Sequence, residues 1–85
     1  RDAVSLINDA NVLASKAEQA LNRLGKNLDK EEKKRIKSDV SELRRLLART
    51  RPQSATEDQL SQIRNAMNSL EVSGASAISR AEQMQ

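Results

Sequence analysis

The chain has 85 residues, and it contains no aromatic residue, no His and no Cys. This length excludes a second globular unit. The missing side chains exclude disulfides, thiolate or imidazole metal sites, and the commonest nucleophiles and general bases. They also exclude stacking on the bases of single-stranded nucleic acid. We therefore expect one domain that is not an enzyme and has no metal or cofactor of its own.

Two further features of the sequence concern its place in a cell. No apolar run approaches the length of a membrane span, and no signal peptide is visible. The chain begins at Arg1 rather than at Met. We therefore expect a fragment of a larger chain that has no membrane among its partners.

The apolar residues predict helices. Leu and Ala dominate them, and both are strong helix formers. Gly25 and Pro52 divide the chain into three segments of similar length. We expect an all-α protein with helices over residues 2–24, 30–49 and 57–80.

The first segment carries one broad apolar face. Its apolar residues recur three and four positions apart, as they do along one side of a helix. They are Ala3, Leu6, Ile7, Ala10, Leu13, Ala14, Ala17, Ala20, Leu21 and Leu24. Gly25 follows directly, where the end of a helix needs a left-handed backbone. The segment predicts a helix that ends before Gly25 and whose alanines permit close approach of its neighbours.

The second segment begins with Asp29, which is expected to cap a helix together with Glu32. Its apolar stripe consists of Ile36, Val40, Leu43 and Leu47, widened by Leu46. Arg51 is followed by Pro52, and a residue before proline resists the helical conformation. The second helix is therefore expected to end near residue 49.

The third segment has the same organisation. Thr56 and Gln59 predict a capping box. The apolar stripe consists of Leu60, Ile63, Met67 and Leu70, flanked by Ala66. Gly74 is expected to bend or break this helix, and the residues after Arg80 are expected to fray. Three amphipathic helices with short loops favour an antiparallel three-helix bundle over residues 1–85, in which a helical hairpin packs on a long first helix.

Positive charge is concentrated in residues 30–49, which hold eight Lys or Arg and four Asp or Glu. The cluster Lys30, Lys33, Lys34, Arg35 and Lys37 has two interpretations. It could bind phosphates, or it could be a solvated helix face on which Glu31 and Arg35 pair across one turn. The second interpretation is favoured, because Glu31 and Glu32 interrupt the cluster and no element for reading bases is present. Nucleic acid is therefore not expected as a partner.

Several stretches of the sequence resemble one family. They are Ala20–Ile36 (ALNRLGKNLDKEEKKRI), Val40–Leu43 (VSEL), Leu60–Leu70 (LSQIRNAMNSL) and the upstream Asn8–Ala10 (NDA). Together they resemble the C-terminal helical lid of DnaK-type chaperones, the 70-kDa heat-shock proteins. The resemblance covers about residues 8–72 and passes without a gap through the first turn. The second turn, residues 49–55, is longer than is usual in the family.

The resemblance implies a function in protein folding and the stress response. The lid belongs to the substrate-binding domain of an ATP-dependent chaperone, and it closes over a bound unfolded peptide and slows its release. ATP would bind elsewhere in the parent protein. The implied partners are the β-sandwich of the same chain and, through the parent, client peptides, a J-domain co-chaperone and a nucleotide exchange factor. The implied location is the bacterial cytoplasm or an organellar matrix. The alternative is a stand-alone three-helix module for protein interaction or scaffolding.

The family's lid is held to the sandwich by a latch, and the resemblance places this latch at Asn11 and Ser15. The family has an acidic residue at the first position and a His or Tyr at the second. Asn11 is neutral and Ser15 is short, so the resemblance implies a weakened latch and a lid that opens more readily. The competing interpretation is that both are ordinary solvent-facing polar residues.

The first helix also suggests self-association. Its apolar face is broader than the hairpin can be expected to cover. The N-terminal half, around Ala3, Leu6, Ile7 and Ala10, would then stay exposed in an isolated fragment. We expect concentration-dependent homodimers of the fragment.

Overall fold

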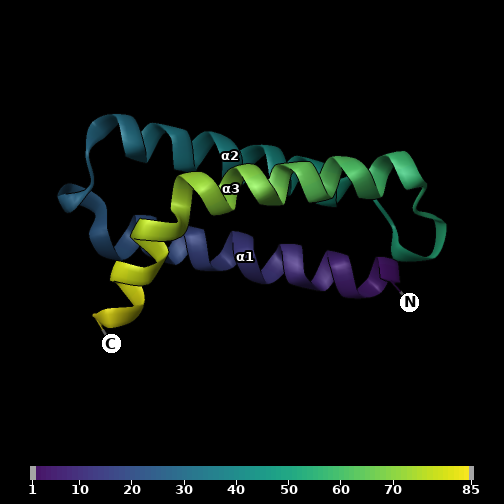
Figure 1. The fold of residues 1–85 in the computed structure, drawn as a ribbon, viewed down its shortest axis with the longest axis horizontal. Coiled ribbons are helices and arrows are strands. Elements are labelled where there is room, and N and C mark those ends of the chain that lie inside the picture. Colours follow the sequence, from purple (N-terminus) through teal and green to yellow (C-terminus); the bar gives the residue numbers. More distant parts are fainter. Residues whose placement is uncertain (1, 85) are drawn as a thin grey trace.

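The computed structural model describes the backbone of residues 2–84 and the side chains of residues 3–84. It contains three α-helices, α1 (Asp2–Leu24), α2 (Lys30–Ala48) and α3 (Glu57–Gln83). Single 3-10 turns at Gly25–Asn27 (η1) and Pro52–Ser54 (η2) lie in the two connections. Figure 1 shows the three helices beside one another, with each helix antiparallel to the one before it. The predicted all-α three-helix bundle is confirmed.

The first turn forms where the sequence predicts it. Gly25 has a φ of 28°, which is a left-handed backbone, and α1 ends at the residue before it. Asp29 caps α2, and its carboxylate accepts a hydrogen bond from the backbone N–H of Glu31 at 3.1 Å, rather than from that of Glu32. The cap is therefore confirmed, although its bonding partner lies one residue earlier than expected.

The second turn and the start of α3 also follow the sequence. Helix α2 ends at Ala48, one residue earlier than predicted, and the buried Thr50 donates its hydroxyl proton to the carbonyl of Leu46 at 2.8 Å. Thr56 and Gln59 form the predicted capping box. The Thr56 hydroxyl accepts from the Gln59 N–H at 3.1 Å, and the Gln59 side chain accepts from the Thr56 N–H at 2.9 Å.

The end of α3 differs from the prediction. The helix does not end near residue 80 but continues to Gln83, and it passes Gly74 without a break. Figure 1 shows that its C-terminal part turns towards α1, which is the bend that Gly74 was expected to cause. Three contacts hold this part in place. Arg23 donates to the carbonyl of Ala81 at 3.3 Å, Lys16 pairs with Glu82 at 3.7 Å, and Arg80 donates to the carbonyl of Asn27 at 3.4 Å.

The bend has an identifiable cause at Ser73 and Gly74. The Ser73 hydroxyl donates to the carboxylate of Asp39 on α2 at 2.7 Å and lies 3.4 Å from the carbonyl oxygen of Leu70. Serine–glycine pairs are common sites of helix kinks, since the serine hydroxyl competes for a backbone carbonyl and glycine adds freedom. Gly74 is itself buried. The bend carries the last turns of α3 away from α2 and onto α1.

Gly74→Ala is expected to raise the free energy of unfolding by up to about 1 kcal/mol, because alanine is the better helix former. A methyl group at this position would lie 3.5 Å and 3.6 Å from the ends of the Leu70 and Ile78 side chains, which is ordinary contact. Urea denaturation followed by circular dichroism measures the change. Ala75→Gly, at the exposed neighbouring position, is the control, and its free energy of unfolding should fall by a similar amount. A less stable Gly74→Ala variant would show that the bend requires glycine.

The core lies between the three helices and is lined by alanine on the α1 side. Its α1 residues are Ile7, Ala10, Ala14, Ala17, Ala20 and Leu24. Opposite them, Ile36, Leu43, Ile63 and Leu70 are the largest fully buried side chains. The predicted stripes are confirmed, with two shifts at their edges. Leu46 is buried while Leu47 is half-buried, and Ala66 is buried while Met67 is half-buried.

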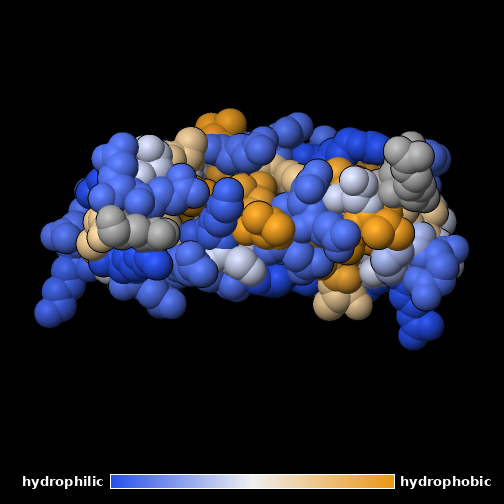
Figure 2. Space-filling view, turned by 90° about the horizontal axis from the view of Figure 1, so that it is seen from below, coloured by the Kyte–Doolittle hydropathy of each residue, from blue (hydrophilic) through white to orange (hydrophobic). Residues whose placement is uncertain are grey.

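The apolar patch that we expected on the N-terminal half of α1 is not exposed. Ile7 is 8% exposed and Ala10 is fully buried, while Ala3 and Leu6 are half-buried. The second turn contributes to this cover, since η2 contacts α1. Figure 2, seen from the α1 side, shows small hydrophobic areas separated by hydrophilic side chains. The expectation of an open patch was therefore wrong, and the predicted homodimer loses the observation that motivated it.

None of the helices in residues 2–84 combines the length and the apolar character needed to cross a lipid bilayer.

Candidate functional site

The two predicted latch positions lie side by side on α1, and both are bound by a residue of α2. Asn11 and Ser15 are exposed and one helical turn apart. The Asn11 side-chain oxygen accepts a hydrogen bond from Arg44 Nη1 at 3.0 Å, and the Ser15 hydroxyl accepts one from Arg44 Nη2 at 3.1 Å. The Asn11 amide nitrogen donates back to the carbonyl of Ile7 at 3.1 Å, which orients the side chain.

Glu18 completes this site. Arg44 Nη2 donates to Glu18 Oε1 at 2.9 Å, and Arg44 Nε donates to Glu18 Oε2 at 3.2 Å. This is a two-pronged pairing, which matches the planar guanidinium to the planar carboxylate. We call Asn11, Ser15, Glu18 and Arg44 the Arg44 cluster. One arginine of α2 thus binds three consecutive turns of α1, and it fastens the hairpin to the first helix outside the apolar core.

The sequence places the three α1 members of this cluster on one line, because Asn11, Ser15 and Glu18 are spaced four and three residues apart. No sequence pattern predicted a contact for Arg44. The available signal was a polar row on α1 beside its apolar face and an arginine next to Leu43 on α2. That signal points to a contact only once the register of the two helices is known.

The electrostatics of the cluster follow from these bonds. The hydrogen bonds from Arg44 lower the pKa of Glu18, burial opposes this lowering, and the positive charge of Arg44 adds to it. The pKa of Arg44 is raised for the same reason. The side chain of Glu18 is 45% exposed, and that of Arg44 is 37% exposed. Solvent therefore screens the pair, and its contribution to stability is limited to the range of partly exposed ion pairs.

The lowered pKa of Glu18 predicts a pH dependence. A carboxylate with a lower pKa in the folded state contributes stability above its unfolded pKa, and this is lost as the pH falls through the folded pKa. The ordinary pKa of a glutamate side chain is 4.5, so the loss is expected below that pH. Arg44→Gln should lower the free energy of unfolding by at most about 1 kcal/mol at neutral pH. Urea denaturation of the wild type and of Arg44→Gln at several pH values measures the difference in their free energies of unfolding.

The control for this experiment is Arg45→Gln. Arg45 binds Glu42 within α2, at 2.7 Å and 3.1 Å, on the solvent side. Removing this pair does not unfasten the hairpin, so it should change stability less than Arg44→Gln. If the difference between the wild type and Arg44→Gln were the same at pH about 7 and about 3, Glu18 would not be the partner that matters.

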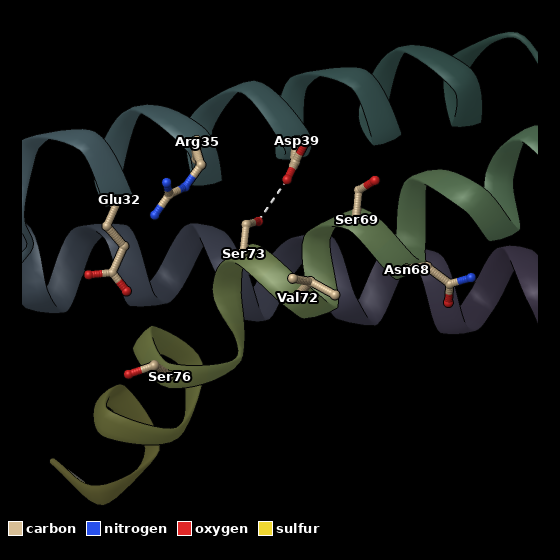
Figure 3. Close-up of a pocket in the computed structure, with 8 residues that line it drawn as sticks. All are labelled: Glu32, Arg35, Asp39, Asn68, Ser69, Val72, Ser73 and Ser76. Atoms are coloured by element: carbon tan, nitrogen blue, oxygen red, sulfur yellow. Dashed lines mark hydrogen bonds between the residues drawn. The ribbon is translucent and has the colours of Figure 1, made fainter.

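A second feature is an open cleft of about 720 Å³ between α2 and α3. Figure 3 shows it in the angle that opens where α3 turns away from α2 after Ser73. Its lining residues are Glu32, Arg35, Asp39, Asn68, Ser69, Val72, Ser73 and Ser76. Asp39 is occupied by its bond to Ser73, and Val72 is 85% exposed. The cleft offers polar contacts to a ligand.

Neither feature resembles a metal site. Within residues 2–84, no group of three or more Asp or Glu side chains is arranged to hold a metal ion. What the Arg44 cluster does chemically is hold two helices together while leaving Asn11 and Ser15 at the surface.

The chain was compared with models of known protein families, with curated proteins and with solved structures. The comparison with family models returns no match, and the comparisons with curated proteins and solved structures return none either. The functional interpretation therefore rests on the residues and contacts of the chain itself.

Proposed function

We propose that the chain is the helical lid of the substrate-binding domain of a DnaK-type, ATP-dependent chaperone. The observation that carries the proposal is the way the hairpin is fastened to α1. Helix α1 runs along the whole hairpin, and the shared apolar core and the Arg44 cluster make one body of the three helices. The resemblance of residues 8–72 to such lids supports it.

The proposed action is steric and needs no chemistry from this chain. A bundle 40 Å long adds bulk to a hinged helix and slows the escape of a bound peptide. ATP, bound in another domain of the parent protein, would bias the hinge towards the open state. The β-sandwich of the same chain would be the surface on which the lid closes. Client peptides, the J-domain co-chaperone and the nucleotide exchange factor would act through the parent protein.

Within the bundle, Arg44 competes with the proposed β-sandwich for the two latch residues. The acceptors of Asn11 and Ser15 are bonded to Arg44. A donor on the sandwich would have to share or displace these bonds. Because a neutral amide gains less from an arginine than a carboxylate does, the exchange favours an unlatched lid. In this proposal the lid opens readily because Arg44 of α2 already binds Asn11 and Ser15.

The test of the function is a comparison of peptide release from the longer chain that the proposal requires. Residues 1–85 are deleted, and the dissociation of a labelled apolar peptide is followed by fluorescence anisotropy in the presence of ADP. Deletion should speed release by about tenfold or more, which corresponds to a barrier lowered by about 1.4 kcal/mol. An unchanged release rate, or a longer chain without a β-sandwich upstream, would favour the stand-alone interaction module.

The latch is tested in the same assay by Asn11→Asp, alone and combined with Arg44→Gln. In the single variant Arg44 should capture the new carboxylate, and the release rate should change little. In the double variant the carboxylate is free to bind an arginine of the sandwich, which should slow release by about fivefold, or about 1 kcal/mol. Equal release rates for the wild type and both variants would show that this face of α1 does not touch the sandwich.

A further inference from the structure

The first half of α2 carries four lysines that have no acidic partner in the bundle. They are Lys30, Lys33, Lys34 and Lys37, and we call them the lysine array. Among residues 3–84, the ion pairs closer than 4.0 Å are Lys16–Glu82, Arg44–Glu18 and Arg45–Glu42. Arg44 and Arg45 of α2 are therefore paired, whereas no lysine of the array has an ion pair among these residues. A shallow cavity of about 510 Å³ is lined by the array and Glu31.

The array lies on the flank of α2 that faces α1. Lys30 and Lys37 precede Arg44 by fourteen and seven residues, and a spacing of seven returns to nearly the same side of a helix. Arg44 is in contact with α1, so the same flank borders α1 at the lysines. Two acidic residues of α2, Glu32 and Asp39, instead line the cleft on the α3 side (Figure 3).

Helix α1 supplies no carboxylate opposite the array. The two helices are antiparallel, so the first half of α2 lies beside the second half of α1 (Figure 1). Between residues 19 and 28 the chain contains no Asp or Glu. The last acidic residue of α1 is Glu18, and Arg44 occupies both of its oxygens. The acidic residues near the array are therefore those at the start of α2 itself, Asp29, Glu31 and Glu32, and they offset its charge only in part.

Three of these lysines lie near the N-terminal end of α2, where Glu31 and Glu32 of the first turn offset their charge only in part. Lys30 is the first residue of the helix, and Lys33 and Lys34 follow within its first turns. Positive charge at the N-terminal end opposes the helix dipole, and like charges one turn apart repel each other. Residues that contradict a local rule without a compensating contact are characteristic of functional surfaces.

We propose that the lysine array is a docking site for an acidic segment of another polypeptide. Lys30, Lys34 and Lys37 are spaced by about 6 Å and about 4.5 Å along the helix axis. Carboxylates one turn apart on a partner helix have the same spacing, so the two rows can pair in the manner of helices that run side by side. The carbon stems of the lysines, which line the cavity, can be covered by the aliphatic carbons of such a partner.

Two other anionic partners fit these observations less well. A bilayer requires an apolar contact in addition to positive charge, and the large exposed apolar side chains of the described residues, Val4, Val12, Val72 and Met84, all lie outside α2. Duplex nucleic acid is bound most strongly through arginines and long rows of cations. Arg44 and Arg45, which would extend the row, are already paired.

The experiment uses the 85-residue chain and a fluorescein-labelled, alanine-based helical peptide with glutamates spaced four and three residues apart. A matched peptide carries glutamine at those positions. Anisotropy should show binding of the glutamate peptide at low salt, weakening as salt rises towards about 0.2 M, and no binding of the glutamine peptide. A variant with Lys30, Lys33, Lys34 and Lys37 all changed to Gln should bind at least about tenfold more weakly, since each exposed pair contributes about two- to fivefold.

The matched control removes three charges away from the array, by changing Arg49, Arg51 and Arg64 to Gln, and it is compared with a triple variant in which Lys30, Lys34 and Lys37 are changed to Gln. The three arginines are exposed, and none belongs to the array. The control variant should bind the glutamate peptide within about twofold of the wild type. Circular dichroism verifies that both variants stay helical. Equal weakening in the two variants would overturn the proposal, because only net charge would then matter.

Two further probes decide the class of partner. A duplex DNA oligonucleotide or vesicles containing phosphatidylserine that bind more tightly than the glutamate peptide would also overturn it. The proposal does not depend on the proposed lid function, because the peptide is presented to the bundle alone and no chaperone activity is measured.

Discussion

Leu43→Ala is expected to lower the free energy of unfolding by about 2–5 kcal/mol. Leu43 is fully buried on α2, between the other two helices, and its removal leaves a cavity that the neighbouring side chains can fill only in part. A bundle of 85 residues has little stability in reserve. Most of the helical signal is therefore expected to be lost at a much lower urea concentration than in the wild type.

Leu47→Ala is the matched control for this measurement. Leu47 has the same side chain on the same helix, one turn later, but it is only half-buried against the core. The free energy of unfolding should fall clearly less in Leu47→Ala than in Leu43→Ala, because less apolar surface returns to water and solvent can fill the gap. Equal losses for the two variants would mean that α2 is rotated about its axis relative to the packing described here.

Ala17→Leu is expected to destabilise the bundle by about 1–3 kcal/mol, even though leucine is more hydrophobic than alanine. Ala10, Ala14, Ala17 and Ala20 are all fully buried along α1. A row of buried methyl groups means that the backbones of neighbouring helices approach closely there, and a larger side chain has to push them apart. Thermal and urea denaturation of the variant measure the loss.

The same substitution at an exposed alanine separates packing from propensity. Ala48→Leu, at the exposed end of α2, should change stability by less than about 0.5 kcal/mol in either direction. A stabilised Ala17→Leu variant would refute close packing along α1 and would indicate unfilled space in the core.

The two fastenings of the hairpin differ in character, and this bears on the proposed lid. The apolar core binds the hairpin to α1 but tolerates small shifts of one helix along another, because hydrophobic contact is not directional. The Arg44 cluster is directional, since it joins one guanidinium to three side chains spaced along α1. A lid that acts by its bulk has to move as one body. In the proposed lid, the cluster would fix the position of α2 along α1, so that the helices move together.

The positions of the helices could be read from the sequence because local rules decide them. The spacing of apolar residues predicted three helices, and Gly25 predicted the end of the first, where the backbone has a φ of 28°. Asp29 and Thr56 marked the two remaining starts. Each of these signals acts within about four residues, through hydrogen bonds at a helix end or through the burial of one helix face.

The predicted stripes are shifted at two of their edges, and the shift has a physical reason. Periodicity gives the direction of an apolar face only to within about one residue, or about 100° of rotation. Whether Leu46 or Leu47 is buried depends on how α2 is turned against its neighbours, and the same holds for Ala66 and Met67. Only the packing of three helices together selects one rotation.

The end of α3 and the Arg44 cluster were decided by tertiary contacts. The last turn of α3 is held against α1 and the first turn by bonds that involve Arg23, Lys16 and Arg80, and by the burial of Ala81. Asn11 and Ser15 were singled out by resemblance, and the bond that holds them comes from Arg44, about thirty residues away. The sequence by itself determined where each helix lies and which face is apolar. Only the tertiary structure decided the register between helices, because side chains distant in sequence meet only after the core has set the helices side by side.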